Sequence, residues 1–589
     1  MRKDTFYIQN IVRVQAVLFL IFALPLQTLK AQSDPKVLWA KRFGGTLSYS
    51  GGCMTSDASG NVYVTGQFEG TADFGNNTFS TTDNIFDLSD AFVLKTDTSG
   101  TVLWAEQFGG ESMDEGISIA IDASDNVYTA GRFGGTATFG NLTLTSENSD
   151  VNVFYNSVYI TKQDTSGEVL WVSEFFGEPD ISLTEYVFNI FSITTDTQGN
   201  IYTLGTFNTV TATFGNITLN RISNYNSLTF NDMFIVKQDA TGQVLWAENF
   251  GTINTDTFAS IIGYDITTDA SDNLYITGNF EGTVVFGDAT FSSYSPYSGD
   301  SFVLKMDALG EVVWVKQFEL GGTTISFSLC ITTDATGNVY VAGVFQGEEL
   351  NIDDITLSSV MDEDNDYYTG DVFAVKISSL GQVLWAKSYG GTGNESASDI
   401  TVDASGKVYI TGHLNGVANF SGNFLVSEGS NDVFVLKTNN AGVVEWVEGF
   451  GWTGSDSGKG IIVDSSGNIY VTGEFEDTVS FGSTDLTATG YKDMFLIKLS
   501  SDDLATEQYL SEQWKVYPNP VQDILTIEVP QTHSETSVEL YNLLGQKIME
   551  YNPVNNTEHI DVSGLAQGVY LLTIRQNGIN KTVKIKKKD

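Results

Sequence analysis

Three aspartates at alternate positions form the clearest metal-binding pattern in the sequence. Asp362, Asp364 and Asp366 lie in the segment MDEDNDYYTGD, and carboxylates spaced in this way occur in calcium-binding loops. Such loops also have a glycine after the third acid and a more distant glutamate, and this segment has neither. The pattern leaves calcium as one interpretation and favours a solvated acidic loop. We expect no other cofactor.

Four aromatic residues outside the regular pattern of the chain are candidates for a ligand-binding surface. They are Trp452, in the segment GWTGSDSG, and Tyr155, Tyr297 and Tyr368. Rings of this kind stack on ligands such as sugars, and they also pack inside hairpins. Packing is the simpler interpretation, and ligand stacking is the functional one.

The elements that position these residues come from a repeat. Val-Leu-Trp or a close variant occurs seven times at spacings of 61 to 75 residues, with its tryptophan at positions 39, 104, 171, 246, 314, 385 and 446. Each unit contains four runs rich in Val, Ile, Tyr, Phe and Thr, bounded by Gly, Asp, Asn and Ser, which is typical of strands and turns. Four strands per unit and seven units predict an all-β, seven-bladed β-propeller.

The two ends of the repeat array are each incomplete. The last unit has strands at 458–464, 468–475 and 493–499 but no Leu-Trp segment after them, while residues 37–43 (VLWAKRF) have no strands before them. We predict that this N-terminal strand completes the last blade and removes the open edges of the ring. The predicted propeller spans residues 36–499.

The strand order sorts the loops onto two faces. Short turns such as DASGN and DTSG lie on one face, and the long connections between the second and third strands lie on the other. These connections carry a sub-repeat, as in GTATFGNLTL, that predicts extra hairpins. Recognition needs differences between blades, so we expect a ligand on the face of the long connections: 69–90, 134–156, 208–230, 281–299, 346–370, 414–430 and 476–492.

Lysine and aspartate recur at fixed places in every unit. A lysine ends each third strand (Lys95, Lys162, Lys237, Lys305, Lys376, Lys437 and Lys498), and an aspartate opens each short turn (Asp57, Asp122, Asp196, Asp269, Asp334, Asp403 and Asp464). The lysines suit an anion-binding ring, but an ion pair with the turn aspartates recurs at the same period and is favoured. The turn aspartates suit Asx-type capping better than calcium binding. A second aspartate series at the start of the third strands is also interpreted as turn capping: Asp90, Asp232, Asp300, Asp371, Asp432 and Asp493, with Ser157 in its place in the second unit.

The net charge, the cysteines and the N-terminal segment indicate which partners are unsuitable and where the protein is located. The net charge of -44 makes nucleic acid and anionic membranes unsuitable partners. Cys53 and Cys330 occupy equivalent places in repeats one and five, too far apart to be bridged, and are predicted to be free thiols. Residues 1–31 contain basic residues and then a short apolar run, a pattern typical of a secretory signal peptide, and no later segment reaches membrane length.

The repeat from DASGN to LWA resembles the bacterial SBBP β-propeller repeat. After a polar linker at 500–514, residues 515–589 resemble the C-terminal sorting domain (type A) of the Bacteroidetes type IX secretion system. The motif residues that carry this resemblance are Pro518, Asn519, Pro520, Gly545, Gly568 and Tyr570. The resemblance implies a small Ig-like β-sandwich that engages the type IX machinery and directs the protein outside the cell or to its surface.

No catalytic motif accompanies these features. HExxH, GxSxG, a phosphate loop and CxxC are all absent from the sequence. The sequence favours a non-enzymatic, exported propeller that binds a glycan or a protein. The alternative is a secreted polysaccharide hydrolase or lyase with acidic residues at the mouth of the channel, and the sequence does not decide whether there is catalysis.

Overall fold

The computed structural model describes residues 35–588, except for 47–48, 76, 82–87, 147–156, 179–187, 224–230, 254–259, 294–298, 322–324, 363–366, 501–514, 529–536, 543–544, 553–556 and 577–578. Within these residues every regular element is a β-strand. Runs rich in β-branched and aromatic residues favour this outcome, since such side chains pack well on a pleated surface.

Seven four-strand units follow one another along the chain, each antiparallel throughout. Unit 1 consists of β2 (Tyr49–Ser56), β3 (Val62–Glu69), β6 (Ser89–Thr96) and β7 (Val102–Gly110). Unit 2 consists of β8 (Glu115–Ile121), β9 (Val127–Phe133), β12 (Ser157–Gln163) and β13 (Val169–Glu178). Unit 3 consists of β14 (Phe188–Thr195), β15 (Ile201–Phe207), β18 (Asp232–Gln238) and β19 (Val244–Phe250).

The remaining units repeat this order. Unit 4 consists of β20 (Ser260–Thr268), β21 (Leu274–Glu281), β24 (Asp300–Met306) and β25 (Val312–Gly321). Unit 5 consists of β26 (Ile325–Thr333), β27 (Val339–Gln346), β32 (Asp371–Ile377) and β33 (Val383–Gly391). Unit 6 consists of β34 (Ser396–Val402), β35 (Val408–Leu414), β38 (Asp432–Thr438) and β39 (Val444–Phe450).

Unit 7 draws its fourth strand from the other end of the array. It consists of β40 (Ser457–Val463), β41 (Ile469–Phe475), β44 (Asp493–Leu499) and β1 (Val37–Gly45). The pairing of β1 with β44 is antiparallel and places Ala40 opposite Ile497 and Phe43 opposite Met494. This is the pairing that the incomplete ends of the repeat array predict.

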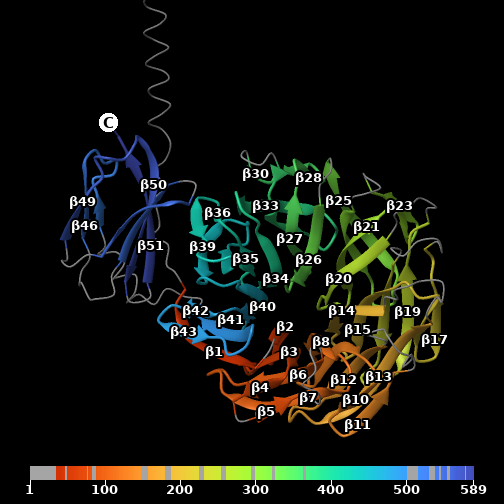
Figure 1. The fold of residues 1–589 in the computed structure, drawn as a ribbon. Coiled ribbons are helices and arrows are strands. Elements are labelled where there is room, and N and C mark those ends of the chain that lie inside the picture. The colour runs from red at the N-terminus through yellow and green to blue at the C-terminus, as the bar shows by residue number, and fades with distance from the viewer. Residues whose placement is uncertain are drawn as a thin grey trace, which may run out of the picture.

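The units are arranged in a circle. The first strand of each unit contacts the first strand of the next, from β2 to β8 and onward to β40, and β40 contacts β2 again. Figure 1 shows the units following one another around this circle, with the red N-terminal strand β1 beside the blue strands of unit 7. Each third strand is buried along its whole length, because it has a sheet on either side of it.

The long connections contain outer hairpins, as their sub-repeat predicts. The hairpins are β4–β5 (Thr71–Phe74, Asn77–Ser80), β10–β11 (Thr136–Phe139, Leu142–Thr145), β16–β17 (Thr211–Phe214, Ile217–Asn220), β22–β23 (Thr283–Phe286, Ala289–Ser292), β28–β29 (Glu349–Ile352, Ile355–Leu357), β36–β37 (Val417–Phe420, Asn423–Val426) and β42–β43 (Thr478–Phe481, Thr484–Thr487). Five of them extend the sheet of the preceding unit by pairing with its fourth strand. The connection in unit 5 also holds β30 (Met361–Asp362) and β31 (Tyr367–Tyr368).

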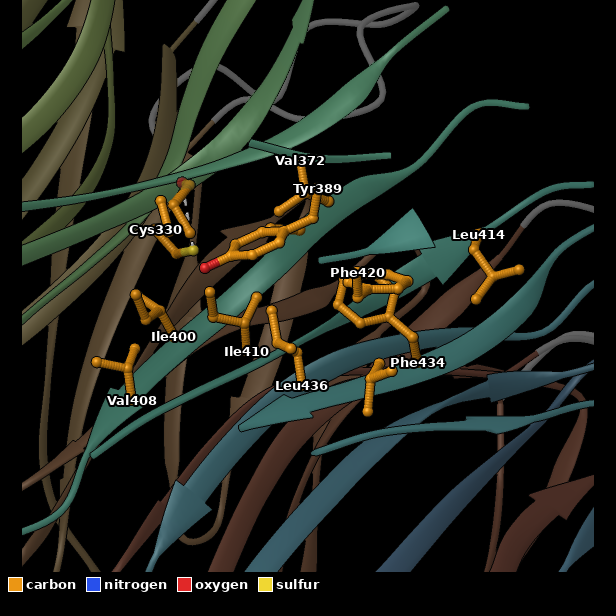
Figure 2. Packing of buried hydrophobic residues seen from close by; sticks show 14 of the residues in the cluster. Cys330, Val372, Tyr389, Ile400, Val408, Ile410, Leu414, Phe420, Phe434 and Leu436 are labelled. Carbon is orange, nitrogen blue, oxygen red and sulfur yellow. Dashed lines mark hydrogen bonds between the residues drawn. The ribbon is translucent and has the colours of Figure 1, made fainter. Parts of the chain in front are cut away.

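The hydrophobic core lies between neighbouring units. Figure 2 shows the cluster between units 5 and 6, where Tyr389 of β33 and Phe420 of β36 pack with Phe434 of β38. The rings of Phe420 and Phe434 lie 5.3 Å apart, centroid to centroid. Because each cluster draws side chains from two units, a unit buries its apolar faces only when both neighbours are in place.

The C-terminal residues form two further sheets. One contains β45 (Lys515–Tyr517), β46 (Ile524–Glu528) and β49 (Thr557–Asp561). The other contains β47 (Ser537–Asn542), β48 (Lys547–Tyr551), β50 (Gly568–Gln576) and β51 (Ile579–Lys587). Side chains of both sheets share one core, which includes Leu525, Leu540 and Leu572. We call these strands the C-terminal module.

Candidate functional site

The repeated aspartates of the short turns cap the turns. In unit 1 the Asp57 Oδ1 atom accepts hydrogen bonds from the Ser59 and Asn61 amides at 3.0 and 2.9 Å. Its Oδ2 atom accepts from the Asn61 side chain at 2.7 Å and from the Tyr63 hydroxyl at 3.1 Å. The aspartates of the other units accept the same kinds of hydrogen bond. The oxygens are therefore used by the turn itself, as Asx-type capping predicts.

The repeated lysines lie against these turns. Lys95 and Asp57 form an ion pair at 3.6 Å, Lys237 and Asp196 one at 3.3 Å, and equivalent pairs occur in units 2 and 5. Each lysine also lies over the ring of the tyrosine that follows its turn, as Lys95 does over Tyr63 at 4.7 Å. The lysine–tyrosine contact recurs in all seven units, and the ion pairs in units 1, 2, 3 and 5 support the structural interpretation of the lysine series.

A lysine and a tryptophan of one unit bind the same backbone carbonyl of the next unit. In unit 2, Lys162 Nζ and Trp171 Nε1 both donate to the Ala240 carbonyl of unit 3 at 3.2 Å. In unit 7 the two donors come from opposite ends of the chain, because Lys498 and Trp39 both donate to the Thr98 carbonyl of unit 1 at 3.2 Å. The repeated Leu-Trp motif therefore joins units together.

The second aspartate series caps the long connections and accounts for a series of glycines. Asp371 accepts a hydrogen bond from the Val360 amide at 3.1 Å, and Asp493 accepts one from the Thr489 amide at 2.9 Å. A Cβ atom on Gly390 would lie 2.3 Å from the Asp371 Oδ1 atom. Glycine at this place in the outer strand therefore makes room for the buried carboxyl.

Pairs of buried acids lie where these aspartates meet the next unit. Asp371 faces Glu395, Asp432 faces Asp456, and Asp90 faces Asp114, each pair interacting electrostatically. Glu395 is 0% exposed and Asp371 is 2% exposed.

The buried acids are protonated more readily than ordinary carboxyls. Burial raises the pKa of Asp371 to about 7 and, together with the charge of Asp371, that of Glu395 to about 9. Among the described residues the Glu395 Oε1 and Asp371 Oδ1 atoms have no hydrogen-bond partner. At this depth the two carboxyls are held by the fold and are closed to a substrate.

Two more acids lie on the first strands, near the centre of the circle. Asp265 accepts a hydrogen bond from the Ile331 amide of the next unit at 2.9 Å, and Asp399 accepts one from the Ile461 amide at 2.7 Å. Burial raises the pKa of Asp265 to about 6 and that of Asp399 to about 7. These acids join neighbouring units, and the interpretation of the sequence missed them.

The signal for these acids was present in the sequence. Each lies four residues before the turn aspartate, which is the place that Cys53 and Cys330 occupy in their units. Both cysteines are free thiols in the structure, as predicted. Burial raises the pKa of Cys53 to about 12 and raises that of Cys330 as well. One position of the repeat thus carries a cysteine in units 1 and 5 and a buried aspartate in units 4 and 6.

Most of the residues predicted to bind a ligand or a metal lie outside the described part of the chain. Tyr155, Tyr297, Asp364 and Asp366 lie outside the described residues, as does the Asp362 side chain. Tyr368 is half-buried in β31. The calcium interpretation of the 362–366 segment therefore stays a prediction.

Exposed aromatic residues of the repeat array gather on the face of the long connections. Trp452 is 46% exposed, Tyr491 is 70% exposed and Tyr367 is 42% exposed. Trp452 follows a fourth strand, and the two tyrosines lie in long connections, so strand order places all three on one face. Tyr367 and Tyr491 were not selected from the sequence, in which 25 tyrosines look alike.

The predicted sorting-motif residues hold the C-terminal module together. The Asn519 side chain donates to the Lys584 carbonyl at 2.6 Å and accepts from the Lys586 amide at 3.0 Å, so it ties the Pro-Asn-Pro segment to β51. The Pro518 and Pro520 peptide bonds are both cis. Gly545 has a φ of +75° in the turn after β47, a conformation that favours glycine.

The other two motif residues, Gly568 and Tyr570, lie in β50, and the neighbouring strand β51 carries exposed lysines. Gly568 begins β50, and the Tyr570 hydroxyl donates to the Ala566 carbonyl at 3.0 Å. Lys584, Lys586 and Lys588 are exposed at alternate positions. Because side chains alternate across a strand, the three lysines form one basic row.

Neither a membrane-spanning helix nor a metal-binding cluster occurs in the described ranges. No helix there is long and apolar enough to span a membrane. Nor does that part of the chain bring together three or more histidine, cysteine, aspartate or glutamate side chains that would hold a metal ion.

Two family models match parts of the chain. Residues 515–588 match the secretion system C-terminal sorting domain, and residues 450–474 match the β-propeller repeat. An uncharacterized WD repeat-containing protein of Acanthamoeba polyphaga mimivirus is 24% identical over 525 residues, which cover 76% of this chain and 36% of that protein. The chain therefore spans little more than a third of the length of this relative.

Solved structures with a similar arrangement share little sequence with the chain. A protein of unknown function from Dyadobacter fermentans has a TM-score of 0.36 at 8% identity, covering 80% of this chain and 99% of that one. A Synechocystis apocarotenoid oxygenase has a TM-score of 0.34 at 11% identity, covering 78% and 95%. YCF48 bound to D1 peptide has a TM-score of 0.32 at 9% identity, covering 81% and 100%.

The matched segments agree with the fold. The β-propeller repeat falls on units 6 and 7 of an all-β circle, and the sorting-domain match covers the whole C-terminal module. The protein thus combines β-propeller repeats with a type IX sorting domain, which engages the type IX machinery and implies export to the cell surface or the extracellular space.

Proposed function

We propose that the protein is an exported, seven-bladed β-propeller that binds a glycan through the face of its long connections, without catalysis. In this proposal each four-strand unit is one blade, β1 closes the last blade, and the C-terminal module is an Ig-like β-sandwich. The circular contacts between first strands and the pairing of β1 with β44 support the blade count and the closure.

The exposed aromatic residues carry the proposal for binding. Trp452, Tyr491 and Tyr367 are the aromatic residues of the described repeat array that are more than about a third exposed, and they share one face. Large exposed rings offer apolar area that a bound partner can bury. Flat aromatic rings beside polar loops suit the apolar faces and hydroxyl rims of sugars.

The buried acids weigh against the hydrolase alternative. A glycosidase needs two carboxyls that reach the scissile bond. The pair Asp371 and Glu395 is buried between units, with the two residues 2% and 0% exposed. Burial raises the pKa of Asp371, and burial together with the charge of Asp371 raises that of Glu395.

A glycan array probed with the purified protein tests the proposal. We expect Trp452→Ala and Tyr491→Ala each to weaken binding of the captured glycan by roughly tenfold or more, as loss of a buried aromatic contact does. Leu309→Ala and Leu380→Ala are matched controls, because these side chains are 80% and 81% exposed on the opposite, short-turn face. Unchanged binding by the aromatic variants, or loss in the controls, would refute the assignment of the face.

A hydrolysis screen on the same glycans tests the absence of catalysis. We expect the glycans to be recovered intact after incubation with the protein. Shortened products that disappear when an exposed acid is replaced would favour the enzyme alternative.

The export part of the proposal includes a signal peptide at residues 1–31 for crossing the inner membrane. Truncation after Ser500 removes the C-terminal module and leaves every strand of the repeat array in place. In a host that has the type IX machinery, we expect the truncated protein to fold and to stay in the periplasm. Normal appearance of the truncated protein in the medium would contradict the sorting role of the module.

A further inference from the structure

Most outer hairpins present the same polar side chains outward. Their first outward pair consists of two hydroxyl groups that hydrogen-bond to each other: Thr71 and Ser80 at 3.0 Å, Thr136 and Thr145 at 2.9 Å, Thr283 and Ser292 at 3.0 Å, and Thr478 and Thr487 at 3.1 Å. Pairs of this kind suit a surface that faces water. We take this hydrogen-bonded pair of hydroxyls as the standard outward pair of the hairpins.

The hairpin β36–β37 departs from this standard. Its first outward pair is Val417 opposite Val426, and its second is Asn419 opposite Phe424. Val417 is only 8% exposed, although its counterpart Thr136 is exposed. Every residue of β37 is half-buried, whereas the equivalent strand β11 alternates between half-buried and exposed. Something therefore covers the apolar face of this hairpin.

The C-terminal module covers it. A Cβ atom on Gly545 would lie 2.2 Å from the Val417 Cγ2 atom and 3.9 Å from the Val426 Cγ1 atom, so the turn after β47 sits directly on the valine pair. Figure 1 shows the module beside β36. The positive φ of Gly545 already accounts for glycine at that place, so the departure of the hairpin, and not the glycine, points to a built contact.

An ion pair next to the valines strengthens the contact. Arg575 of β50 pairs with Glu428, which follows β37, and Arg575 also lies 3.6 Å from Glu539 within the module. Glu428 is fixed by its own backbone, because its amide donates to the Asp432 carboxyl at 2.9 Å. Residues 515–589 carry equal numbers of basic and acidic side chains, so the net charge of -44 lies in the rest of the chain and attracts a guanidinium.

We propose that the hairpin β36–β37 is a dedicated docking surface for the C-terminal sorting module of the same chain. The surface consists of Val417, Phe424, Val426 and Glu428, and it receives the Gly545 turn and Arg575. The module is thereby held against one defined unit, with the basic row of β51 in a fixed orientation. Removal of the module exposes the pair Val417 and Val426, at a place where the four hairpins described above have hydroxyl side chains.

An engineered disulfide tests the contact in the full-length chain. The Val417 Cβ atom lies 3.7 Å from the Cβ position of residue 545, within the range that a disulfide spans. A protease site is inserted into residues 501–514 of the double variant Val417→Cys/Gly545→Cys. After oxidation and cleavage, we expect the band of the free module to be lost from a non-reducing gel and to return on reduction. The control Thr136→Cys/Gly545→Cys places the cysteine on the equivalent hairpin of unit 2 and should release the module.

Equal release of the module from the two cysteine variants would overturn the proposal. Because Gly545→Cys strains the turn and can prevent folding of the module, a charge exchange gives a second test. We expect Glu428→Arg to increase the radius of gyration in small-angle X-ray scattering, and Glu428→Arg/Arg575→Glu to restore the original value. A radius of gyration that is the same in all three proteins would also overturn the proposal.

Discussion

Replacement of Phe43 by alanine measures how much the N-terminal strand contributes to the last unit. Phe43 is 4% exposed and packs on Phe74 with a centroid distance of 6.5 Å. Removal of a buried phenylalanine side chain costs about 3–5 kcal/mol. Because β1 is tied to unit 7 mainly through β44, we expect most of this cost to appear as easier separation of β1 from β44.

Hydrogen exchange of the native protein reports this separation. A loss of about 3–5 kcal/mol accelerates the exchange of backbone amides in residues 494–499 roughly 10²- to 10⁴-fold when exchange follows the opening equilibrium. Leu38→Ala is the matched control on the same strand, because Leu38 is 42% exposed and its loss costs no more than about 0.5 kcal/mol.

The equivalent change in an internal strand completes the comparison. Phe108 occupies the same place in β7 and is 0% exposed, so Phe108→Ala should accelerate exchange in β6 and leave β44 protected. Exchange in residues 494–499 that is the same in Phe43→Ala and in the unchanged protein would refute closure by the N-terminal strand.

Three further predictions follow from the buried groups. Since folding raises the pKa of Glu395 from 4.5 to about 9, its contribution to stability is complete below pH 4.5 and is lost as the pH rises towards 9; the melting temperature should fall over this range, and less steeply in Glu395→Gln. Cys330, 2% exposed, should react with a thiol reagent only after unfolding, and rapid reaction in the native protein would contradict its burial. Gly390→Ala should destabilise the protein by about 1–3 kcal/mol in urea unfolding through its clash with Asp371, whereas Gly52→Ala, whose nearest contact is 3.6 Å away, should be close to neutral.

The repeat made much of the fold predictable from the sequence. The seven copies of Val-Leu-Trp and its close variants, together with the turn aspartates, locate the strands, because strand and turn residues alternate at a fixed period in each unit. The pairing of 37–43 with 493–499 followed from one missing strand at each end. The docking of the module was beyond this reasoning, since it depends on which hairpin lies next to it in space.

The candidate site was less predictable, because exposure decides it. Trp452 differs from the Leu-Trp series and was selected from the sequence, but Tyr491 is distinguished only by being 70% exposed. Glu395 and Asp371 lie 24 positions apart in an acidic chain, and only the fold brings them together between two units. Buried pairs of like charge leave no pattern in a sequence that has 73 acidic residues.

The pairing of β1 with β44 sets an order of events during synthesis. The first strand of the array is made before β44, which lies at the opposite end, so the pairing of β1 with unit 7 waits until the last repeat exists. A chain that stops before residue 493 keeps an open strand edge, which invites pairing with other chains. The sorting module follows β44 in the sequence, and it is therefore made only on a chain whose circle is ready to close. The strand that completes the repeat array is thus the last one before the sorting module in the chain.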